Sequence, residues 1–414
     1  MRNSGFLWII VGIMVLLDIY VFQAIKFIAP SSPKLRTTIY IFYWLLAITS
    51  VVILILLPYI NFEQWPKTTR SYIFATIAGF FFSKIVVSLF LAIDDLRRGG
   101  MWIYGKLFTN SSIEITLATE GISRSNFLSW LGLAVGGGLF GTLMYGFNNK
   151  YNYNLNRIKL SYKNLPQNFK GIKIVHISDI HSGSFMDKLA VQKGVDKIIA
   201  EKPDLILFTG DLVNDRSSEM NEYMDLFSKL RAPLGVFSTL GNHDYGDYVK
   251  WENEEAKSAN LHRLKQIHGE LGWRLLMNEH VVLERGEETI AVLGIENWSA
   301  KGRFPKYGKM NEAHPGTEKH PFKILLSHDP SHWEAEVLTK YKDVDLMLSG
   351  HTHGMQFGVE LPGFKWSPIQ YIYKQWAGLY ESEFQKLYVN RGFGFLGYPG
   401  RVGILAEITV IELT

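Results

Sequence analysis

The chain has 414 residues, a length that favours two or three units, each large enough to bury a core of its own. Its formal net charge of +4 is small for that length, and no cluster of lysine or arginine is interleaved with aromatic residues, so no nucleic-acid partner is expected. The absence of cysteine excludes disulfides, thiolate catalysis and cysteine-ligated metal sites. Any metal must therefore be bound by His, Asp, Asn or Glu side chains.

Histidines and long apolar runs lie in different parts of the sequence. All 12 histidines fall between His176 and His353, whereas the long apolar runs fall within the first 150 residues. One part is therefore suited to lipid and the other to water. We expect a transmembrane region over residues 1–150 and a domain that carries the chemistry over residues 151–414.

Four stretches of the N-terminal part are long and apolar enough to cross a membrane, which takes about 20 residues of helix. They are residues 5–28, 39–60, 72–93 and 127–147. The first stretch is longer than the apolar core of a cleaved signal peptide, which has about 7–15 residues, so we expect it to be retained. The sequence therefore predicts an integral membrane protein with several crossings.

The orientation of these helices follows less directly from the sequence. Four crossings place the N-terminus and the C-terminal domain on one side, but basic residues flank both sides about equally, so the positive-inside rule does not choose between them. Residues 123–128 (SRSNFL) resemble a twin-arginine export signal in which Ser125 replaces the second arginine. This resemblance favours an extracytoplasmic C-terminal domain. The alternative is that Arg124 serves only as an anchor at the membrane interface.

Some polar and small residues inside the apolar stretches indicate how the helices pack against one another. Asp18 and Lys84 lie at similar depths of two helices that run in the same direction, and buried ionisable residues are usually partnered. We expect them to pair, either as a structural contact or as part of a path for an ion or substrate. The fourth stretch has two pairs of glycines at the spacing that lets another helix approach closely, Gly132 with Gly136 and Gly137 with Gly141.

From about residue 157 the pattern changes to short β-branched runs that alternate with amphipathic stretches. Such alternation is typical of a layered α/β domain with buried strands. The expected strands are residues 172–177, 204–208, 234–240, 289–295, 323–327 and 344–349. In open α/β sheets the functional residues collect beyond the carboxyl ends of the strands.

Polar residues follow five of these six runs. In chain order they are Asp179 and His181, Asp211, Asn242 with His243 and Asp244, His328, and finally His351 and His353. Asp, His and Asn side chains are ligands that suit Mn, Fe or Zn. One such residue is usually a core histidine or a helix cap, but five clusters at successive strand ends are not explained in that way.

The ordered series Asp-x-His, Gly-Asp, Gly-Asn-His-Asp, His, Gly-His-x-His is similar to that of the calcineurin-like metallophosphoesterase superfamily, over roughly residues 157–414. Residues 348–356 and the ending from Arg391 to Glu407 resemble its bacterial membrane-associated branch, which commonly has Gly in place of Met355. Together with the four apolar stretches, the resemblance predicts a four-helix transmembrane region followed by an α/β domain built as a layered β-sandwich flanked by helices. It also implies a bacterial inner or cytoplasmic membrane.

The resemblance further implies two divalent metal ions, which are Mn, Fe, Zn or a mixture. One ion would be held by Asp179, His181 and His353, the other by Asn242, His328 and His351, with Asp211 bridging them. His243 would instead protonate the leaving oxygen, with Asp244 orienting its ring. The implied reaction is the hydrolysis of a phosphoester by a water that the metals activate.

Aromatic residues are frequent after His353, at Phe357, Phe364, Trp366, Tyr371, Tyr373 and Trp376. Together with Lys365 and Lys374 they suit the headgroup level of a membrane, and the alternative is that they pack a long loop onto the domain. Arg391 and Arg401 are expected either to reach the substrate phosphate or to serve as exposed ion pairs or loop anchors. We interpret the histidines outside the motif as ordinary surface or core residues: His262, His268, His280, His314, His320 and His332.

The leading hypothesis is therefore a phosphohydrolase that acts on a lipid or cell-envelope phosphoester. If the domain is cytoplasmic, the alternative is a nucleotide–lipid pyrophosphate, the kind of substrate that membrane-anchored UDP-diacylglucosamine hydrolases of the same superfamily cleave. A scaffold without catalysis is disfavoured because no ligand of the motif is missing. A transporter is disfavoured because the helices carry no polar track beyond Asp18 and Lys84. The sequence does not specify the oligomeric state.

Overall fold

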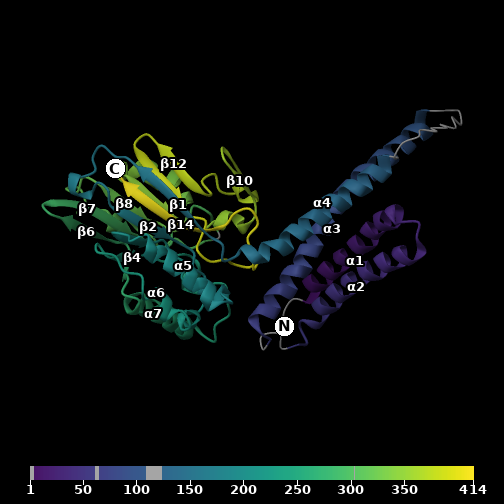
Figure 1. Cartoon of the computed structure of the whole chain (residues 1–414), viewed down its shortest axis with the longest axis horizontal. Helices are drawn as coiled ribbons and strands as arrows, with labels where there is room; N and C mark the ends of the chain where they lie inside the picture. Colours follow the sequence, from purple (N-terminus) through teal and green to yellow (C-terminus); the bar gives the residue numbers. More distant parts are fainter. Residues whose placement is uncertain (1–3, 61–64, 109–123, 303) are drawn as a thin grey trace. The chain divides into compact units, whose positions relative to one another are not determined.

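The computed structural model describes residues 4–60, 65–108, 124–302 and 304–414. The first residue of the export-like segment, Ser123, lies outside this part of the chain. The chain forms two compact units, Met1–Tyr145 and Gly146–Thr414 (Figure 1). In the described residues the first unit is helical, and the strands belong to the second.

Four helices of the first unit are long and apolar enough to cross a membrane, as predicted. Their bounds are α1 (Ser4–Ile28), α2 (Pro33–Leu56), α3 (Lys67–Phe108) and α4 (Arg124–Gly146). With 42 residues, α3 extends well beyond the apolar stretch that predicted it. An ion pair between Asp94 and Arg97, one turn apart, supports the helix where the apolar stretch has ended. Hydropathy therefore located the candidate crossing but not the end of the helix.

The predicted ion pair between Asp18 and Lys84 is confirmed. Lys84 Nζ on α3 lies 2.7 Å from Asp18 Oδ1 on α1, and each side chain is only 2% exposed. The Tyr43 hydroxyl on α2 donates to the Asp18 carbonyl oxygen at 2.9 Å and lies 3.3 Å from Asp18 Oδ1. This buried contact therefore connects three of the four helices.

The first glycine pair of α4 faces α3. A Cβ atom on Gly136 would lie 2.5 Å from Val87 Cγ2 and 2.9 Å from the carbonyl oxygen of Ser83, and Gly132 is similarly close to α3. Only glycine permits this close approach of the two helices. The second predicted pair has no such neighbour within 4 Å in the described part of the chain, so close packing is limited to the first pair.

Two six-stranded sheets form the centre of the second unit, with the orders β1-β14-β2-β3-β4-β5 and β12-β13-β9-β8-β7-β6. The strands of the first sheet are β1 (Tyr153–Leu160), β2 (Lys173–Ile177), β3 (Leu205–Phe208), β4 (Val236–Ser238), β5 (Arg274–Leu275) and β14 (Ala406–Leu413). Those of the second are β6 (Glu279–Arg285), β7 (Glu288–Gly294), β8 (Lys323–Leu326), β9 (Leu346–Ser349), β12 (Gly378–Ser382) and β13 (Gln385–Val389). All six predicted strands are present, as β2, β3, β4, β7, β8 and β9.

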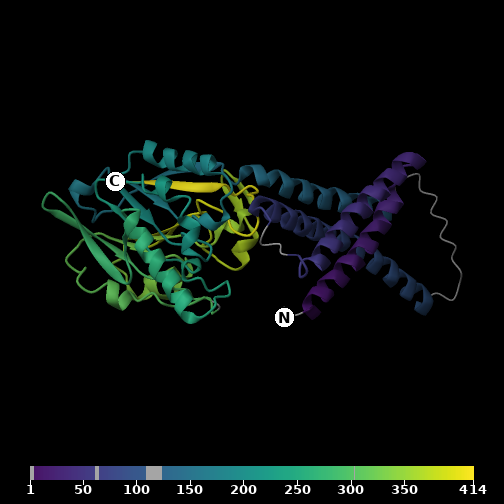
Figure 2. The same cartoon turned by 90° about the horizontal axis from the view of Figure 1, so that it is seen from below.

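Apolar side chains fill the space between the two sheets, for example Ile174 and Leu207 from the first and Ile324 and Leu348 from the second. Helices pack against both outer faces and bury further clusters there (Figure 2). They are α5 (Lys188–Ala200), α6 (Met224–Phe227), α7 (Glu254–Glu270), α8 (Met310–Ala313) and α9 (Leu338–Lys340). The expected layered β-sandwich flanked by helices is therefore confirmed.

The direction of the central strands determines where the site forms. β2, β3 and β4 are parallel to one another in the first sheet, as are β7, β8, β9 and β13 in the second. The carboxyl ends of parallel strands lie at the same edge of their sheet. The polar clusters that follow β2, β3, β4, β8 and β9 are thereby brought together. A separate two-stranded hairpin, β10 (Val359–Leu361) with β11 (Phe364–Trp366), follows the last cluster.

Candidate metal centre

The loops that leave the strand ends have an unusual backbone. Five of the predicted ligand residues have positive φ angles: Asp179 (52°), His181 (47°), Asp211 (60°), His351 (72°) and His353 (50°). A residue other than glycine adopts this left-handed conformation only at a cost, of order 1–3 kcal/mol, that the surrounding structure must offset. The fold therefore holds these side chains in conformations that an unconstrained loop disfavours.

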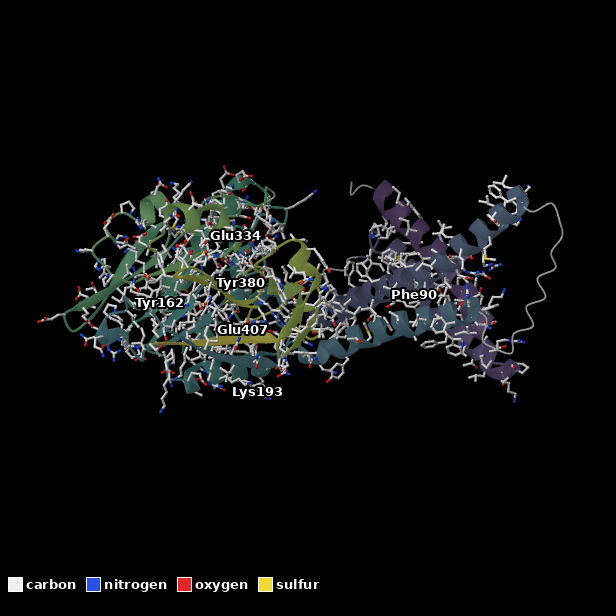
Figure 3. All side chains as sticks on the ribbon, turned by 90° about the horizontal axis from the view of Figure 1, so that it is seen from above. Phe90, Tyr162, Lys193, Glu334, Tyr380 and Glu407 are labelled. Carbon is white, nitrogen blue, oxygen red and sulfur yellow. The ribbon has the colours of Figure 1, made fainter. Side chains whose placement is uncertain are left out.

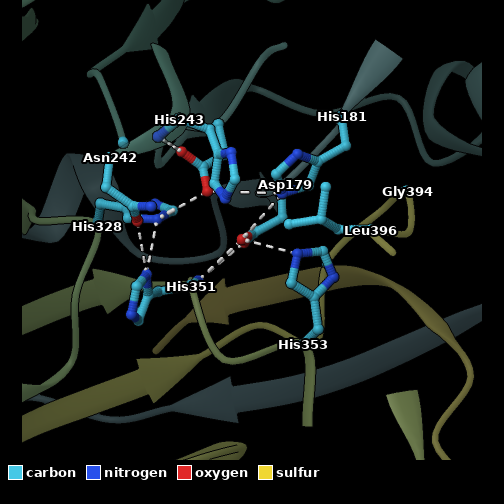
Figure 4. A network of polar contacts seen from close by, with 12 residues as sticks. Asp179, His181, Asn242, His243, His328, His351, His353, Gly394 and Leu396 are labelled. Atoms are coloured by element: carbon cyan, nitrogen blue, oxygen red, sulfur yellow. Dashed lines mark hydrogen bonds and ion pairs between the residues drawn. The ribbon is translucent and has the colours of Figure 1, made fainter. Parts of the chain in front are cut away.

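Asp179, His181 and His353 form one buried group whose potential ligand atoms all lie within 4.8 Å of one another (Figure 4). His353 Nε2 is 3.2 Å from Asp179 Oδ1, and His181 Nε2 is 4.0 Å from the same oxygen. The backbone N–H of His351 donates to both Asp179 oxygens at 3.0 Å. The carboxylate is thus fixed between the two rings.

A second group brings together Asp211, His328, His351 and Asn242. His328 Nε2 lies 3.1 Å from Asp211 Oδ2, and His351 Nδ1 lies 2.8 Å from Asn242 Oδ1. Asp211 Oδ2 is also 3.5 Å from His181 Nε2, which belongs to the first group. Asp211 therefore occupies the position between the two groups.

The donor atoms fit a pair of metal ions better than they fit one another. His181 Nε2 and His353 Nε2 are buried without a hydrogen-bond partner among the described residues. His351 Nδ1 and His328 Nε2 face each other at 3.2 Å, although two ring nitrogens need a proton or a cation between them. Buried polar atoms are otherwise nearly always satisfied. Imidazole, carboxylate and amide donors are those that divalent metals such as Mn, Fe or Zn accept.

A surrounding set of polar groups orients the histidine rings. The Thr209 carbonyl oxygen lies 2.7 Å from His328 Nδ1, and Asn214 Oδ1 lies 3.1 Å from His181 Nδ1. These contacts leave the Nε2 atoms of both rings directed at the carboxylates. Contacts of this kind fix the tautomer and the direction of metal-binding histidines.

His351 is oriented by residues that the sequence did not point out. Its Nε2 atom lies 2.8 Å from the Tyr373 hydroxyl, which donates to Asp329 Oδ2 at 3.2 Å. Asp329 directly follows the predicted ligand His328, so its place in the sequence could have identified it as a residue of the site. Tyr373 stands far along the chain in the aromatic stretch, and nothing in its local sequence distinguished it.

The charges of the site suit a divalent ion. Burial lowers the pKa of His181 to about 3 and also lowers the pKa of His351, so both rings are neutral near pH 7. Burial opposes the ionisation of Asp211, but nearby His328 and His243 hold the pKa of Asp211 well below its ordinary range. Burial also disfavours the charge on His328, yet Asp211 and Asp179 raise its pKa to about 10. A bound metal would replace the proton that His328 and Asp211 share.

His243 lies beside the two groups rather than within them. Its Nδ1 atom is 2.8 Å from the backbone carbonyl oxygen of Asn214, and its backbone N–H donates to Asp211 Oδ1 at 2.8 Å. A carbonyl oxygen only accepts, so Nδ1 carries a hydrogen and Nε2 is the nitrogen that can take up or release a second proton. The ring also packs against Tyr248, with 4.5 Å between their centroids.

Asp244 requires a correction, because its carboxylate does not hold the ring of His243. It accepts backbone N–H groups instead, from Asp211 and Gly241 at Oδ2 and from Leu212 at Oδ1. The expected contact fails because the Asn214 carbonyl occupies Nδ1 of His243. Asp244 therefore stabilises the loop that presents Asp211.

A cavity of about 470 Å³ opens onto both groups. Its polar lining residues are His181, Asp211, Asn242, His243, His351 and His353. Its other lining residues are mainly apolar or aromatic: Tyr248, Phe304, Thr352, Ile369, Tyr373 and Leu396. The cavity can therefore accept a ligand with a polar group at the metal centre and apolar atoms beyond it.

The two arginines near the C-terminus are loop anchors and are not directed at a substrate phosphate. Arg401 is fully buried and donates to the carbonyl oxygens of Arg391 and Gly394. Arg391 is paired with Glu360 and with Glu407, which lies on β14 (Figure 3). Of the two expected alternatives, the structure supports the anchoring role.

Histidines outside the motif lie away from the two groups. His268 is buried on α7, where burial lowers its pKa to about 3 and Ser238 contacts its Nδ1 atom. His262 is exposed on the same helix. His314 pairs with Asp343 at the surface. These histidines are ordinary core or surface residues.

The sequence matches two family models. Residues 1–150 match the family described as "Probable Calcineurin-like phosphoesterase, transmembrane domain", and residues 172–355 match the family "Calcineurin-like phosphoesterase". The first model covers the four apolar helices. The second covers the five clusters that form the two groups.

Relatives with related descriptions match more than half of the chain. The UDP-2,3-diacylglucosamine pyrophosphatase LpxG of Chlamydia trachomatis is 30% identical, over 58% of this chain and 84% of the relative. The phosphodiesterase YaeI of Escherichia coli is 27% identical, over 58% of this chain and 82% of the relative. The "Transmembrane protein with metallophosphoesterase domain" of Danio rerio is 29% identical over 62% of this chain. This chain matches only 56% of the length of the Danio rerio protein.

Proposed function

Because the chain belongs to the calcineurin-like metallophosphoesterase family, a family of metal-dependent hydrolases, we propose that it cleaves a lipid or cell-envelope phosphoester at a dinuclear metal centre. The observation that carries this proposal is the convergence of two ligand groups on Asp211, beside one cavity. The four apolar helices make the chain a membrane protein. A membrane-anchored hydrolase acts most readily on substrates in or near the same membrane.

We assign the ligands as the two groups suggest. Asp179, His181 and His353 would hold one divalent ion and Asn242, His328 and His351 the other, with Asp211 placed between the two groups. When bound, two such ions lower the pKa of a shared water and neutralise charge on the phosphoryl oxygens. The chain's contribution is to keep the donor atoms fixed, through the Thr209 carbonyl and the Tyr373 hydroxyl.

His243 is assigned the role of general acid. The Asn214 carbonyl holds its Nδ1–H, so Nε2 is free to carry the proton that the leaving oxygen takes up. Its backbone N–H contacts the bridging carboxylate of Asp211, so the position of the ring is tied to the centre it serves. The acid thus lies beside the cavity without competing for the ligand atoms.

The wall of the cavity favours a substrate with apolar atoms. Phe304, Ile369 and Leu396 line it together with the polar groups. A small hydrophilic phosphate monoester would leave these side chains in contact with water, whereas an acyl or prenyl chain would cover them. A lipid-linked phosphoester therefore suits the mixed polar and apolar lining of the cavity.

A second candidate substrate is a nucleotide–lipid pyrophosphate, because the LpxG relative is named as a UDP-2,3-diacylglucosamine pyrophosphatase. This alternative requires a cytoplasmic domain, where nucleotide-linked substrates are made. The export-like segment instead favours an extracytoplasmic domain. A phosphatase reporter and a fluorescent reporter fused after Thr414 distinguish the two orientations.

The full-length protein in nanodiscs provides the test of the activity. Hydrolysis of an aryl phosphodiester with Mn²⁺, Fe²⁺ or Zn²⁺, abolished by a chelator and restored by metal, is the expected result. A phospholipid phosphoester and UDP-2,3-diacylglucosamine are then compared as substrates at equal concentration. Absence of metal-dependent turnover on every phosphoester would overturn the proposal, and preference for the UDP-linked lipid would favour the alternative.

A further inference from the structure

Exposed apolar side chains are frequent in the segment of the second unit that follows the last ligand cluster. They are Met355, Val359, Leu361, Phe364, Tyr371 and Ile372, each between 43% and 76% exposed. We call this set the 355–372 surface. Large apolar side chains that are exposed together mark a contact with another apolar phase more often than scattered ones do.

The hairpin at the centre of this surface is amphipathic with its apolar side outward. Leu361 pairs with Phe364 across the two strands, and their side chains therefore share the outer face. Glu360 pairs with Lys365 on the other face, toward the domain. There Glu360 binds Arg391, and Lys365 Nζ lies near the Ala377 carbonyl oxygen at 2.5 Å.

This arrangement reverses the usual preference of a soluble hairpin, which directs charge to water and apolar groups to the core. The charged side chains of the hairpin are paired with groups of the domain, although Glu360 remains 36% exposed. The apolar ones remain outside without a core to fill. Stability of the hairpin alone does not require this pattern, so the outer face needs another explanation.

The chain enters the second unit directly beside this surface. α4, a candidate membrane span, ends at Gly146, whose carbonyl oxygen accepts the backbone N–H of Arg401 at 3.0 Å. The next residue after Arg401, Val402, exchanges backbone hydrogen bonds with Gln356 and Gly358 at 2.8 and 2.9 Å. Val359, the first residue of β10, directly follows Gly358, so β10 begins in a hydrogen-bonded segment that includes the end of α4.

The same segment reaches the mouth of the cavity. The side chain of Gln356 accepts the backbone N–H of Leu396 at 2.6 Å, and Leu396 lines the cavity. Ile369, which also lines the cavity, lies two residues before Tyr371 of the surface. The apolar surface and the apolar wall of the cavity are therefore neighbours.

We propose that the 355–372 surface lies in the boundary between headgroups and acyl chains of the bilayer that anchors the chain, so that the mouth of the cavity opens toward lipid. The occupant of the surface is the bilayer, because the surface adjoins the point at which the chain leaves it. Phenylalanine, leucine and tyrosine side chains suit this depth of a membrane. The residues of the aromatic stretch therefore have two different roles. Tyr373 and Trp376 are buried in the domain, whereas Phe364 and Tyr371 are exposed.

The absence of cysteine makes a direct test possible. Phe364→Cys is labelled with a polarity-sensitive fluorophore in the full-length protein, reconstituted in nanodiscs of phosphatidylcholine and phosphatidylglycerol. Phe384→Cys is the matched control, because Phe384 is 54% exposed and Phe364 is 57% exposed. Phe384 directly precedes β13, whose carboxyl end leads to the metal centre, so it lies at the opposite end of the sheet.

Lipids with nitroxide groups near the headgroup are expected to quench the label at position 364 several times more strongly than the label at 384. Aqueous iodide should show the opposite order. Equal quenching at the two positions, or strong iodide quenching at 364, would overturn the proposal and leave a protein partner as the occupant of the surface. Unfolding curves of both variants confirm that the labels report on folded protein. The readout does not depend on turnover, so a failed activity assay would leave this inference intact.

Discussion

Both units of the molecule bury charged or ionisable side chains, but they satisfy them differently. In the membrane unit Asp18 and Lys84 are each other's partner, and the Tyr43 hydroxyl completes the contact. In the second unit two buried ring nitrogens, His181 Nε2 and His353 Nε2, have no hydrogen-bond partner among the described residues, although both lie near carboxylate oxygens. The first cluster is complete as it stands, whereas the second is complete only with cations.

This difference separates a structural site from a binding site. A buried ion pair that closes on itself has no free coordination and gives no reason to infer a ligand. Convergent donors with unpaired atoms cost free energy unless something binds them. The membrane cluster is therefore better explained as a helix contact than as a path for ions, and the other cluster as a metal centre. Substitutions in each cluster test this distinction.

The largest effect is expected from Asp211→Ala, because Asp211 Oδ2 lies near His328 of one group and His181 of the other. Both metals should be lost, and turnover should fall by more than the ~10²–10⁴-fold that loss of a general acid causes. Metal content by mass spectrometry and turnover of an aryl phosphodiester measure this. Asp343→Ala, which removes a half-exposed carboxylate paired with His314, should retain both properties. Full metal content in Asp211→Ala would contradict the bridging role.

Replacing His351 and His353 one at a time should remove a different metal ion in each variant. His351→Ala is expected to empty the group of His328 and Asn242, and His353→Ala the group of Asp179 and His181, because each ring contacts ligands of one group and not of the other. Each variant should retain about half of the metal, since each group holds one ion. Anomalous diffraction from crystals of the Mn²⁺-loaded variants would show which position remains. Loss of the same position in both variants would refute the assignment.

A smaller loss is expected from His243→Ala, which should bind both metals but turn over ~10²–10⁴-fold more slowly. The loss should shrink when the leaving group is an acidic phenol, because such an oxygen departs without a proton. His262→Ala, an exposed histidine on α7, is the control and should behave as the parent protein. An equal loss for acidic and basic leaving groups would argue against the role of general acid.

The substitution Asp244→Asn tests whether Asp244 supports the loop of Asp211 or acts on the ring of His243. Its carboxylate accepts backbone N–H groups from Asp211, Leu212 and Gly241 and makes no contact with the ring of His243. The substitution should therefore weaken metal binding through the Asp211 loop and leave the dependence of rate on the leaving group unchanged. Measured metal affinity and the leaving-group series distinguish this from a direct action on His243.

Much of the architecture was predictable because its signals are local. Each predicted strand is a short apolar run, and each ligand cluster follows such a run directly, so chain order alone located both. The membrane helices were equally predictable, because a run of about 20 apolar residues indicates a helix that spans a membrane. The pairing of Asp18 with Lys84 followed from their similar depth in parallel helices.

Other features depend on contacts between distant segments and left no local signal. Tyr373 orients His351 only because a long loop returns to the site, and the Asn214 carbonyl holds His243 through its backbone, which any residue type offers. Strands β1 and β14 pair although nearly the whole second unit separates them in sequence. The helical continuation of α3 beyond residue 93 carries charges, and hydropathy does not register it.

The smallest effect on catalysis, and the clearest on stability, is expected from the membrane pair. Lys84→Met leaves Asp18 buried without its cation and should lower the free energy of unfolding by about 3–5 kcal/mol. The double variant Lys84→Met with Asp18→Leu removes both charges and should recover most of that loss, because a closed buried pair contributes little net stability beyond its own desolvation. Unfolding in detergent, followed by circular dichroism, measures both variants. Turnover of the double variant should equal that of the parent protein. A double variant that is stable yet inactive would show instead that the membrane pair has a role in the reaction, and the distinction between the two clusters would then fail.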